Sequence, residues 1–120
     1  MSHIVSILTK VHDAVSVRAA CRRLGLSDPV EGTAQLFSGE ASGLLVQLPG
    51  WQYPVVIDIL TGNVNYDNYD GAWGETAHLD RFLQSYAVER AKLEARKKGY
   101  GVSETALQDG SIKLHIMEGC

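Results

Sequence analysis

The residues whose types and spacing could do chemistry in this chain lie between Trp51 and Glu75, in the segment WQYPVVIDILTGNVNYDNYDGAWGE. The segment holds carboxylates, which can bind hard cations, and aromatic rings, which bind partners by burial and stacking. Its closing loop is too aromatic for an ordinary solvated connection, and too rich in glycine and aspartate for regular structure. We therefore predict a binding surface here, formed by Trp51, Tyr53, Tyr66, Asp67, Tyr69, Asp70 and Trp73.

A cation site is one possible use of this segment, with Asp58, Asp67 and Asp70 as its weak candidate ligands. Calcium and magnesium need several carboxylate or carbonyl oxygens. The spacing departs from that of a calcium-binding loop, because aligning the central glycine would place Tyr66 and Ala77 at the first and last ligand positions. The favoured interpretation is a polar turn whose side chains bond to their own backbone, with no metal or cofactor.

The chain lacks a complete catalytic constellation. Ser42 lies in the pattern Gly-Glu-Ala-Ser-Gly, which displaces the serine from the Gly-x-Ser-x-Gly elbow of hydrolases. Cys21 falls on the apolar side of a predicted helix, where a cysteine acts as a small core residue. The histidines and cysteines show no metal-ligand spacing. No catalytic residue is predicted, and whether the protein is an enzyme stays open.

The charge layout indicates the kind of partner. The net charge is −3, but no lysine or arginine occurs from Leu24 to Asp80, while bases gather from Arg81 to Lys98. Glu89 and Glu94 interleave with these bases at pairing distance, as on a solvated helix face, so nucleic-acid binding is not favoured. A segment that is aromatic, acidic and free of bases fits a protein partner with a basic surface.

The elements that must position these residues follow from hydrophobic periodicity and from turn residues. Strands are expected at 3–11, 33–37, 44–48, 55–60, 64–66, 102–107 and 111–117, and helices at 13–24 and 76–98. The 120 residues form one domain, 1–120. The order β-α-ββ-ββ-α-ββ predicts an α+β fold in which an antiparallel sheet carries two helices packed on one face.

Several stretches resemble one family along almost the whole chain. They are MSHIVSI, RAACRRLGL, YPVVIDILTGNVNYDNYDGAWGE, HLDRFLQSYAVERAKLEARKKGY and LQDGSIKL. Together they are similar to domain-of-unknown-function family 1257, small bacterial proteins that include a hypothetical chloroplast reading frame. The resemblance implies a small protein without assigned catalytic residues. It also implies an accessory role beside an AAA-type ATPase.

These observations predict a non-enzymatic protein-binding or accessory module. The alternatives are a metal- or metabolite-binding enzyme or sensor that uses the acidic loop, and a homo-oligomeric structural protein. A cytoplasmic location is expected, because the N-terminus lacks a secretory signal and Cys21 and Cys120 do not suggest a disulfide framework. No apolar stretch approaches the ~20 residues of a membrane span.

Overall fold

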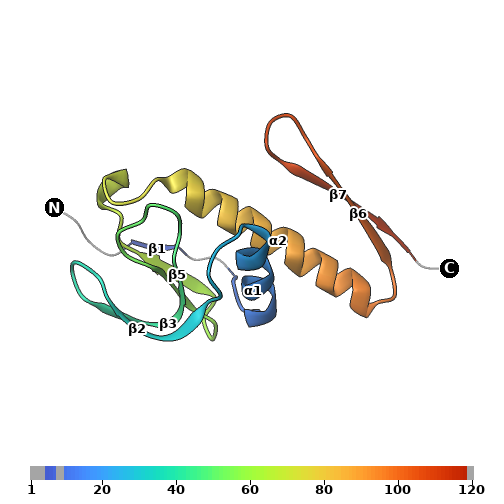
Figure 1. Cartoon of the computed structure of the whole chain (residues 1–120). Coiled ribbons are helices and arrows are strands. Elements are labelled where there is room, and N and C mark those ends of the chain that lie inside the picture. Colours follow the sequence, from blue (N-terminus) through green and yellow to red (C-terminus); the bar gives the residue numbers. More distant parts are fainter. Residues whose placement is uncertain (1–4, 8–9, 119–120) are drawn as a thin grey trace.

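The computed structural model of this chain describes residues 5–7 and 10–118, with 5–7 and 70 described by their backbone alone. The described residues form an α+β fold with two antiparallel sheets and two α-helices (Figure 1). The described elements are β1 (Val5–Ile7), α1 (Ala14–Arg23), β2 (Val30–Gln35), β3 (Glu40–Val46), β4 (Val55–Asp58), β5 (Asn63–Tyr66), the 3-10 helix η1 (Tyr69–Gly71), α2 (Thr76–Lys97), β6 (Gly101–Ala106) and β7 (Ile112–Met117). The predicted fold class and element order are confirmed.

The main sheet has five strands in the order β1-β5-β4-β3-β2, and every neighbouring pair is antiparallel. In the central strand β4, Val55, Val56 and Ile57 are all fully buried. Because successive side chains of a strand point to opposite faces, both faces of the sheet must be covered at β4. The helices cover one face, and part of the β2–β3 hairpin covers the other.

The helices form where the sequence places their caps and apolar stripes. Asp13 caps α1, accepting hydrogen bonds from the Val15 amide (3.2 Å) and the Ser16 hydroxyl (2.6 Å). Along α2, Leu79, Phe82 and Tyr86 recur at helical spacing and are buried. The main core cluster between the helices and the sheet includes Val17, Ala20, Cys21, Val46, Val55, Ile57, Val64, Leu79, Phe82 and Tyr86.

The face opposite the helices is covered by the tip of the β2–β3 hairpin, residues 33–42, which we call the hairpin tip. The hairpin curves strongly (Figure 1), so that Ala34 and Leu36 form a second small core cluster with Val56. Gly32 and Gly43 pair across the two strands of this hairpin. A Cβ atom on Gly43 would lie 2.4 Å from the Ile57 carbonyl oxygen, so only glycine permits this approach.

Both strands of this hairpin begin and end earlier in the sequence than predicted. Expected strands at 33–37 and 44–48 correspond to β2 at Val30–Gln35 and β3 at Glu40–Val46. The glycines predicted a loop at 38–43, but Gly43 lies within β3. A glycine is needed at this strand position because the backbone of β4 packs closely against it. At the first predicted strand, 3–11, the structure gives β1 at Val5–Ile7 and no strand at 10–11; residues 3, 4, 8 and 9 lie outside the described residues.

The last hairpin forms a separate two-stranded sheet beside α2 rather than joining the main sheet. On β7, Ile112 and Leu114 are partly buried, whereas Ile116 is 44% exposed. Charged groups attach the hairpin to the helices: Glu104 on β6 pairs with Arg23 of α1 and with Lys92 of α2, the latter at 2.7 Å. Neither of the two described α-helices combines the length and apolar character of a membrane span.

We predict that Gly43→Ala lowers the free energy of unfolding by about 2 kcal/mol or more, because the new methyl group must displace the backbone of β4. Urea unfolding followed by circular dichroism measures this. Gly32→Ala is the matched control: its Cβ would meet only Leu45 Cδ1, at an ordinary 3.8 Å. Equal stability of the two variants would contradict the close packing at Gly43.

The ion-pair network predicts a pH dependence of stability. Hydrogen bonds from Arg23 and then Lys92 lower the pKa of Glu104 from 4.5 to about 2. Because the pKa is lower in the folded state, this stabilisation is complete above pH 4.5 and is lost as the pH falls toward about 2.

Glu104→Gln should therefore be less stable than the wild type at neutral pH, and the difference should disappear in strong acid. Urea unfolding over an acid pH series measures both proteins. Glu40→Gln is the control, because Glu40 has no ion pair among the described residues. A difference that persists at the lowest pH would show that the network does not anchor the hairpin.

Candidate functional site

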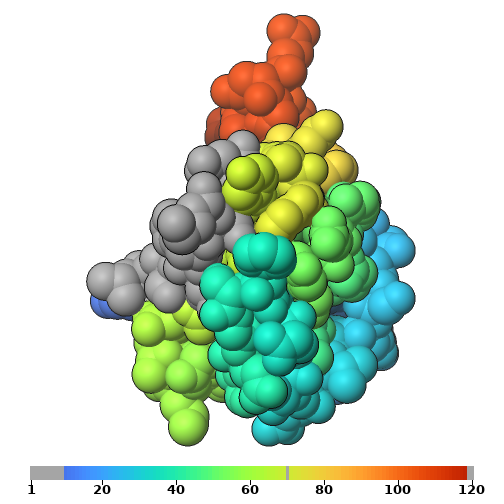
Figure 2. All heavy atoms as spheres, turned by 90° about the vertical axis from the view of Figure 1, so that its left-hand side faces the viewer, coloured from blue at the N-terminus to red at the C-terminus, as the bar shows by residue number. Residues whose placement is uncertain are grey.

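The candidate site lies at the end of the sheet where the hairpin tip, the β3–β4 loop and the loop carrying η1 meet. Figure 2 shows the teal hairpin tip, the green β3–β4 loop and the yellow loop before α2 side by side at this end. The segments come together because the tip folds back over the sheet toward the end of β5. Residues far apart in the sequence thus share one surface.

Trp73 is the centre of a group of four rings on this surface. Its ring centroid lies 4.9 Å from that of Tyr69, 5.1 Å from that of Phe37 and 5.6 Å from that of Tyr53. Tyr69 stacks on Trp73, with 24° between the ring planes, while Phe37 and Tyr53 meet it at steeper angles. Phe37 is 60% exposed and Tyr69 is 45% exposed. We call Phe37, Tyr53, Tyr69 and Trp73 the ring surface.

The loop that carries two of these rings is held by a buried tryptophan. Trp51 is buried, and its indole Nε1 donates a 3.0 Å hydrogen bond to the Glu75 carbonyl. A Cβ atom on Gly74 would lie 2.4 Å from the Trp51 ring, so the loop backbone rests directly on the indole. Asn68, also buried, donates from Nδ2 to the Gly74 carbonyl at 3.2 Å. These contacts fix the loop, although it has little regular structure.

Tyr69 adopts a strained backbone conformation within this fixed loop. Its φ is +48°, and no other described residue apart from glycines has a positive φ. This left-handed conformation costs a residue with a Cβ atom roughly 1–2 kcal/mol. The strain places the tyrosine ring flat against Trp73, where it remains accessible. Strained residues of this kind cluster at ligand-binding and catalytic sites.

Asp67 lies beneath the surface rather than on it. It is 1% exposed, and its Oδ2 accepts a 3.3 Å hydrogen bond from the Ser38 hydroxyl in the hairpin tip. Its Oδ1 is the buried side-chain atom that lacks a hydrogen-bond partner among the described residues. A buried acceptor without a partner is uncommon in proteins. The bond to Ser38 ties the tip to the end of β5.

The structure divides the seven residues predicted for the binding surface. Tyr53, Tyr69 and Trp73 belong to the ring surface, while Trp51 and Tyr66 contact each other edge-on at 5.6 Å on the side of the main core. Asp67 is buried, and Asp70 lies in η1, with its side chain outside the described part.

The three candidate cation ligands do not share one turn. Asp58 is at the turn joining β4 to β5, where its Oδ1 accepts from the Leu60 amide at 3.0 Å and the Thr61 amide at 3.4 Å. Asp67 follows the other end of β5, so the length of this strand separates the two carboxylates. Among the described residues, no three histidine, cysteine, aspartate or glutamate side chains form a group that could hold a metal ion.

Phe37 is the functional candidate that sequence reasoning missed. It lies 16 residues or more from the other three rings of the ring surface, and its local sequence predicts only the end of a strand. Its neighbours in the fold depend on how the β2–β3 hairpin curves over the sheet (Figure 1). The only local signal was a phenylalanine directly before the turn residues Ser38 and Gly39.

Comparison of this chain with protein-family models, with curated proteins and with solved structures found no match.

We predict that Tyr69→Gly is more stable than Tyr69→Ala by about 1 kcal/mol. Both substitutions remove the stacked ring, but only glycine also relieves the left-handed backbone. Chemical denaturation of the two variants measures the difference. Phe37→Gly and Phe37→Ala are the control pair, because the φ of Phe37 is not positive. At this position the alanine variant should be the more stable of the two. A Tyr69 alanine variant as stable as the glycine variant would show that the backbone is unstrained.

Proposed function

We propose that this protein is a non-enzymatic binding module that docks a protein partner with a basic surface on its ring surface. The observation that carries the proposal is that Tyr69 and Phe37 remain exposed while each packs on Trp73. Rigid aromatic side chains of this kind are enriched at the centres of protein interfaces, where they bury much area at low entropic cost.

The electrostatic environment supports a basic partner. The ring surface lies within the stretch from Leu24 to Asp80, which contains no lysine or arginine. Arginine and lysine side chains of a partner can lie over aromatic faces, an interaction worth about 0.5–2 kcal/mol. Within this proposal, the resemblance to family 1257 points to an AAA-type ATPase as the partner and to a cytoplasmic accessory role.

The test is affinity purification of the tagged full-length protein from its own host, followed by quantification of each co-purifying polypeptide. We expect the double variant Phe37→Ala/Tyr69→Ala to lose its partner at least about 10-fold, since exposed aromatic anchors contribute about 2 kcal/mol or more. Recovery should also fall with added salt, which screens the attraction of a basic partner.

Tyr100→Ala is the matched control, because it removes an aromatic ring that lies after α2, outside the ring surface. Melting curves show whether all variants are folded. Equal recovery of every partner by the wild type and the double variant would overturn the proposal. Loss in the control variant as well would show that the effect is not specific to the ring surface.

A further inference from the structure

At the edge of the main sheet next to the ring surface, some backbone groups have no partner among the described residues. β2 is an outer strand, and β3 is the only described strand that pairs with it. The Leu36 amide donates to the Gly39 carbonyl at 2.8 Å, and hydrogen-bonded pairs recur at every second residue of an antiparallel ladder. The amides and carbonyls that face away from β3 therefore belong to Glu31, Thr33 and Gln35.

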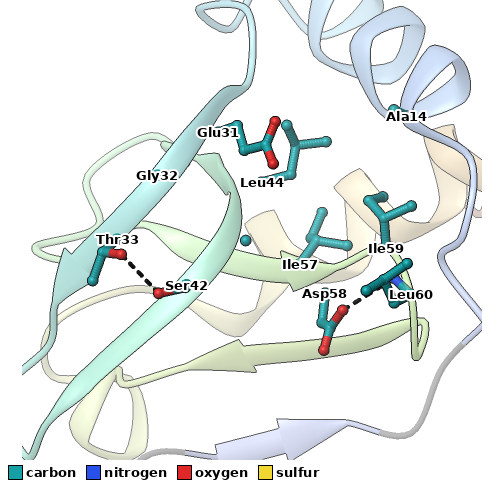
Figure 3. Close-up of a pocket in the computed structure, with 11 residues that line it drawn as sticks. Ala14, Glu31, Gly32, Thr33, Ser42, Leu44, Ile57, Asp58, Ile59 and Leu60 are labelled. Atoms are coloured by element: carbon teal, nitrogen blue, oxygen red, sulfur yellow. Dashed lines mark hydrogen bonds between the residues drawn. The ribbon is translucent and has the colours of Figure 1, made fainter.

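A trough lies beside this edge, on the face of the sheet that carries the helices. The helices stop short of the β2–β3 side, leaving an open depression of about 680 Å³. Its lining is mainly apolar and includes Ala14, Leu44, Ile57, Ile59 and Leu60. Figure 3 shows these side chains around the depression, with Glu31 beside Leu44 at the β2 side. Leu60 is 92% exposed, so the trough has an accessible apolar wall.

The polar groups of the trough indicate the charge of its occupant. Glu31 has no ion pair among the described residues, and its carboxylate reaches over the apolar lining (Figure 3). The Thr33 and Ser42 hydroxyls satisfy each other at 2.7 Å, and Asp58 is engaged with its own turn. Glu31 is therefore the carboxylate on the β2 side of the trough that is available to pair with a cation.

The edge and the ring surface are continuous. β2 ends at Gln35, and Phe37 of the ring surface follows two residues later. At about 3.3 Å per residue, a strand of this length covers roughly 20 Å. An extended segment laid along β2 would thus run from the trough to the ring surface.

We propose that the partner contributes an extended, basic segment that adds to the free edge of β2 as a further strand. Its backbone bonds to Glu31, Thr33 and Gln35, its alternate apolar side chains enter the trough, and a lysine or arginine pairs with Glu31. This inference rests on the proposed function and defines how the partner binds. In this mode of recognition, backbone bonds give affinity and pockets for alternate side chains give specificity.

The experiment uses peptides selected from a displayed library of random segments of roughly ten residues, long enough to span β2. The full-length protein is the bait, and selected peptides should alternate apolar and basic residues. Amide hydrogen exchange is then followed by NMR with the selected peptide. The Glu31, Thr33 and Gln35 amides should become protected at least about 10-fold, while Gly32 and Ala34, already bonded to β3, should change little.

Two controls separate strand addition from other binding. Two peptides are compared, one N-methylated at its odd-numbered residues and the other at its even-numbered residues. One of them should lose binding and the other should keep it, because only one of the two sets of amides faces β2. Glu31→Lys should weaken binding at least about 10-fold by placing like charges together, whereas Glu40→Lys should not.

Protection elsewhere, binding that is insensitive to the phase of N-methylation, or failure to select any alternating basic peptide would each overturn the inference. These amides could also be protected in the free protein, to a degree that grows with protein concentration. Such a result would assign the edge to a second copy of the chain and would also overturn the inference. If Phe37→Ala/Tyr69→Ala still releases the partner, the docking function stands without strand addition. If it does not, both fail.

Discussion

The packing of Gly43 against the backbone of β4 is the constraint on which the rest of the structure depends. A Cβ atom at this position would lie only 2.4 Å from the Ile57 carbonyl oxygen. The absence of a side chain therefore allows the β2–β3 hairpin to pack closely on β4 and to turn back over the sheet. This single approach buries Val56, gives the sheet its second covered face and carries Phe37 to Trp73. A larger residue would separate the tip from the sheet. The second core cluster and the ring surface would then be lost together.

A second rigid contact, between Gly74 and the indole of Trp51, sets the opposite side of the surface. The two tryptophans have different roles: Trp51 is a core residue that orients the loop, and Trp73 is the ring on which the exposed aromatics pack. Because the loop is fixed from below, it can hold Tyr69 in a costly left-handed conformation. The exposed ring is thus preorganised, which reduces the entropy that binding must overcome.

The molecule separates its charges along its length. The ring surface and the lining of the trough, apart from Ala14, belong to the base-free stretch, while the last turn of α2 carries Arg96 and Lys97. The last hairpin lies beside α2, and an isolated two-stranded hairpin is only marginally stable. Glu104 stabilises its placement by bridging α1 and α2 through Arg23 and Lys92. Two surfaces of different character therefore result, one aromatic and acidic, the other a charged helical face with an exposed hairpin.

The sequence by itself determined the element order, the fold class and the ends of the helices, because apolar periodicity and the Asp13 cap are local properties of the chain. Gly99, two residues after the end of α2, is such a local signal too, since its φ is +79° and glycine adopts this conformation readily. The sequence also located the aromatic segment. Only the tertiary structure decided which rings are exposed: Trp51 and Trp73 are the same residue type, but Trp51 is buried in the main core and Trp73 is half-buried beneath Phe37 and Tyr69. It also brought in Phe37 and buried Asp67, since both depend on how the hairpin bends. Such a bend is fixed by contact between segments distant in the chain, which local periodicity does not encode.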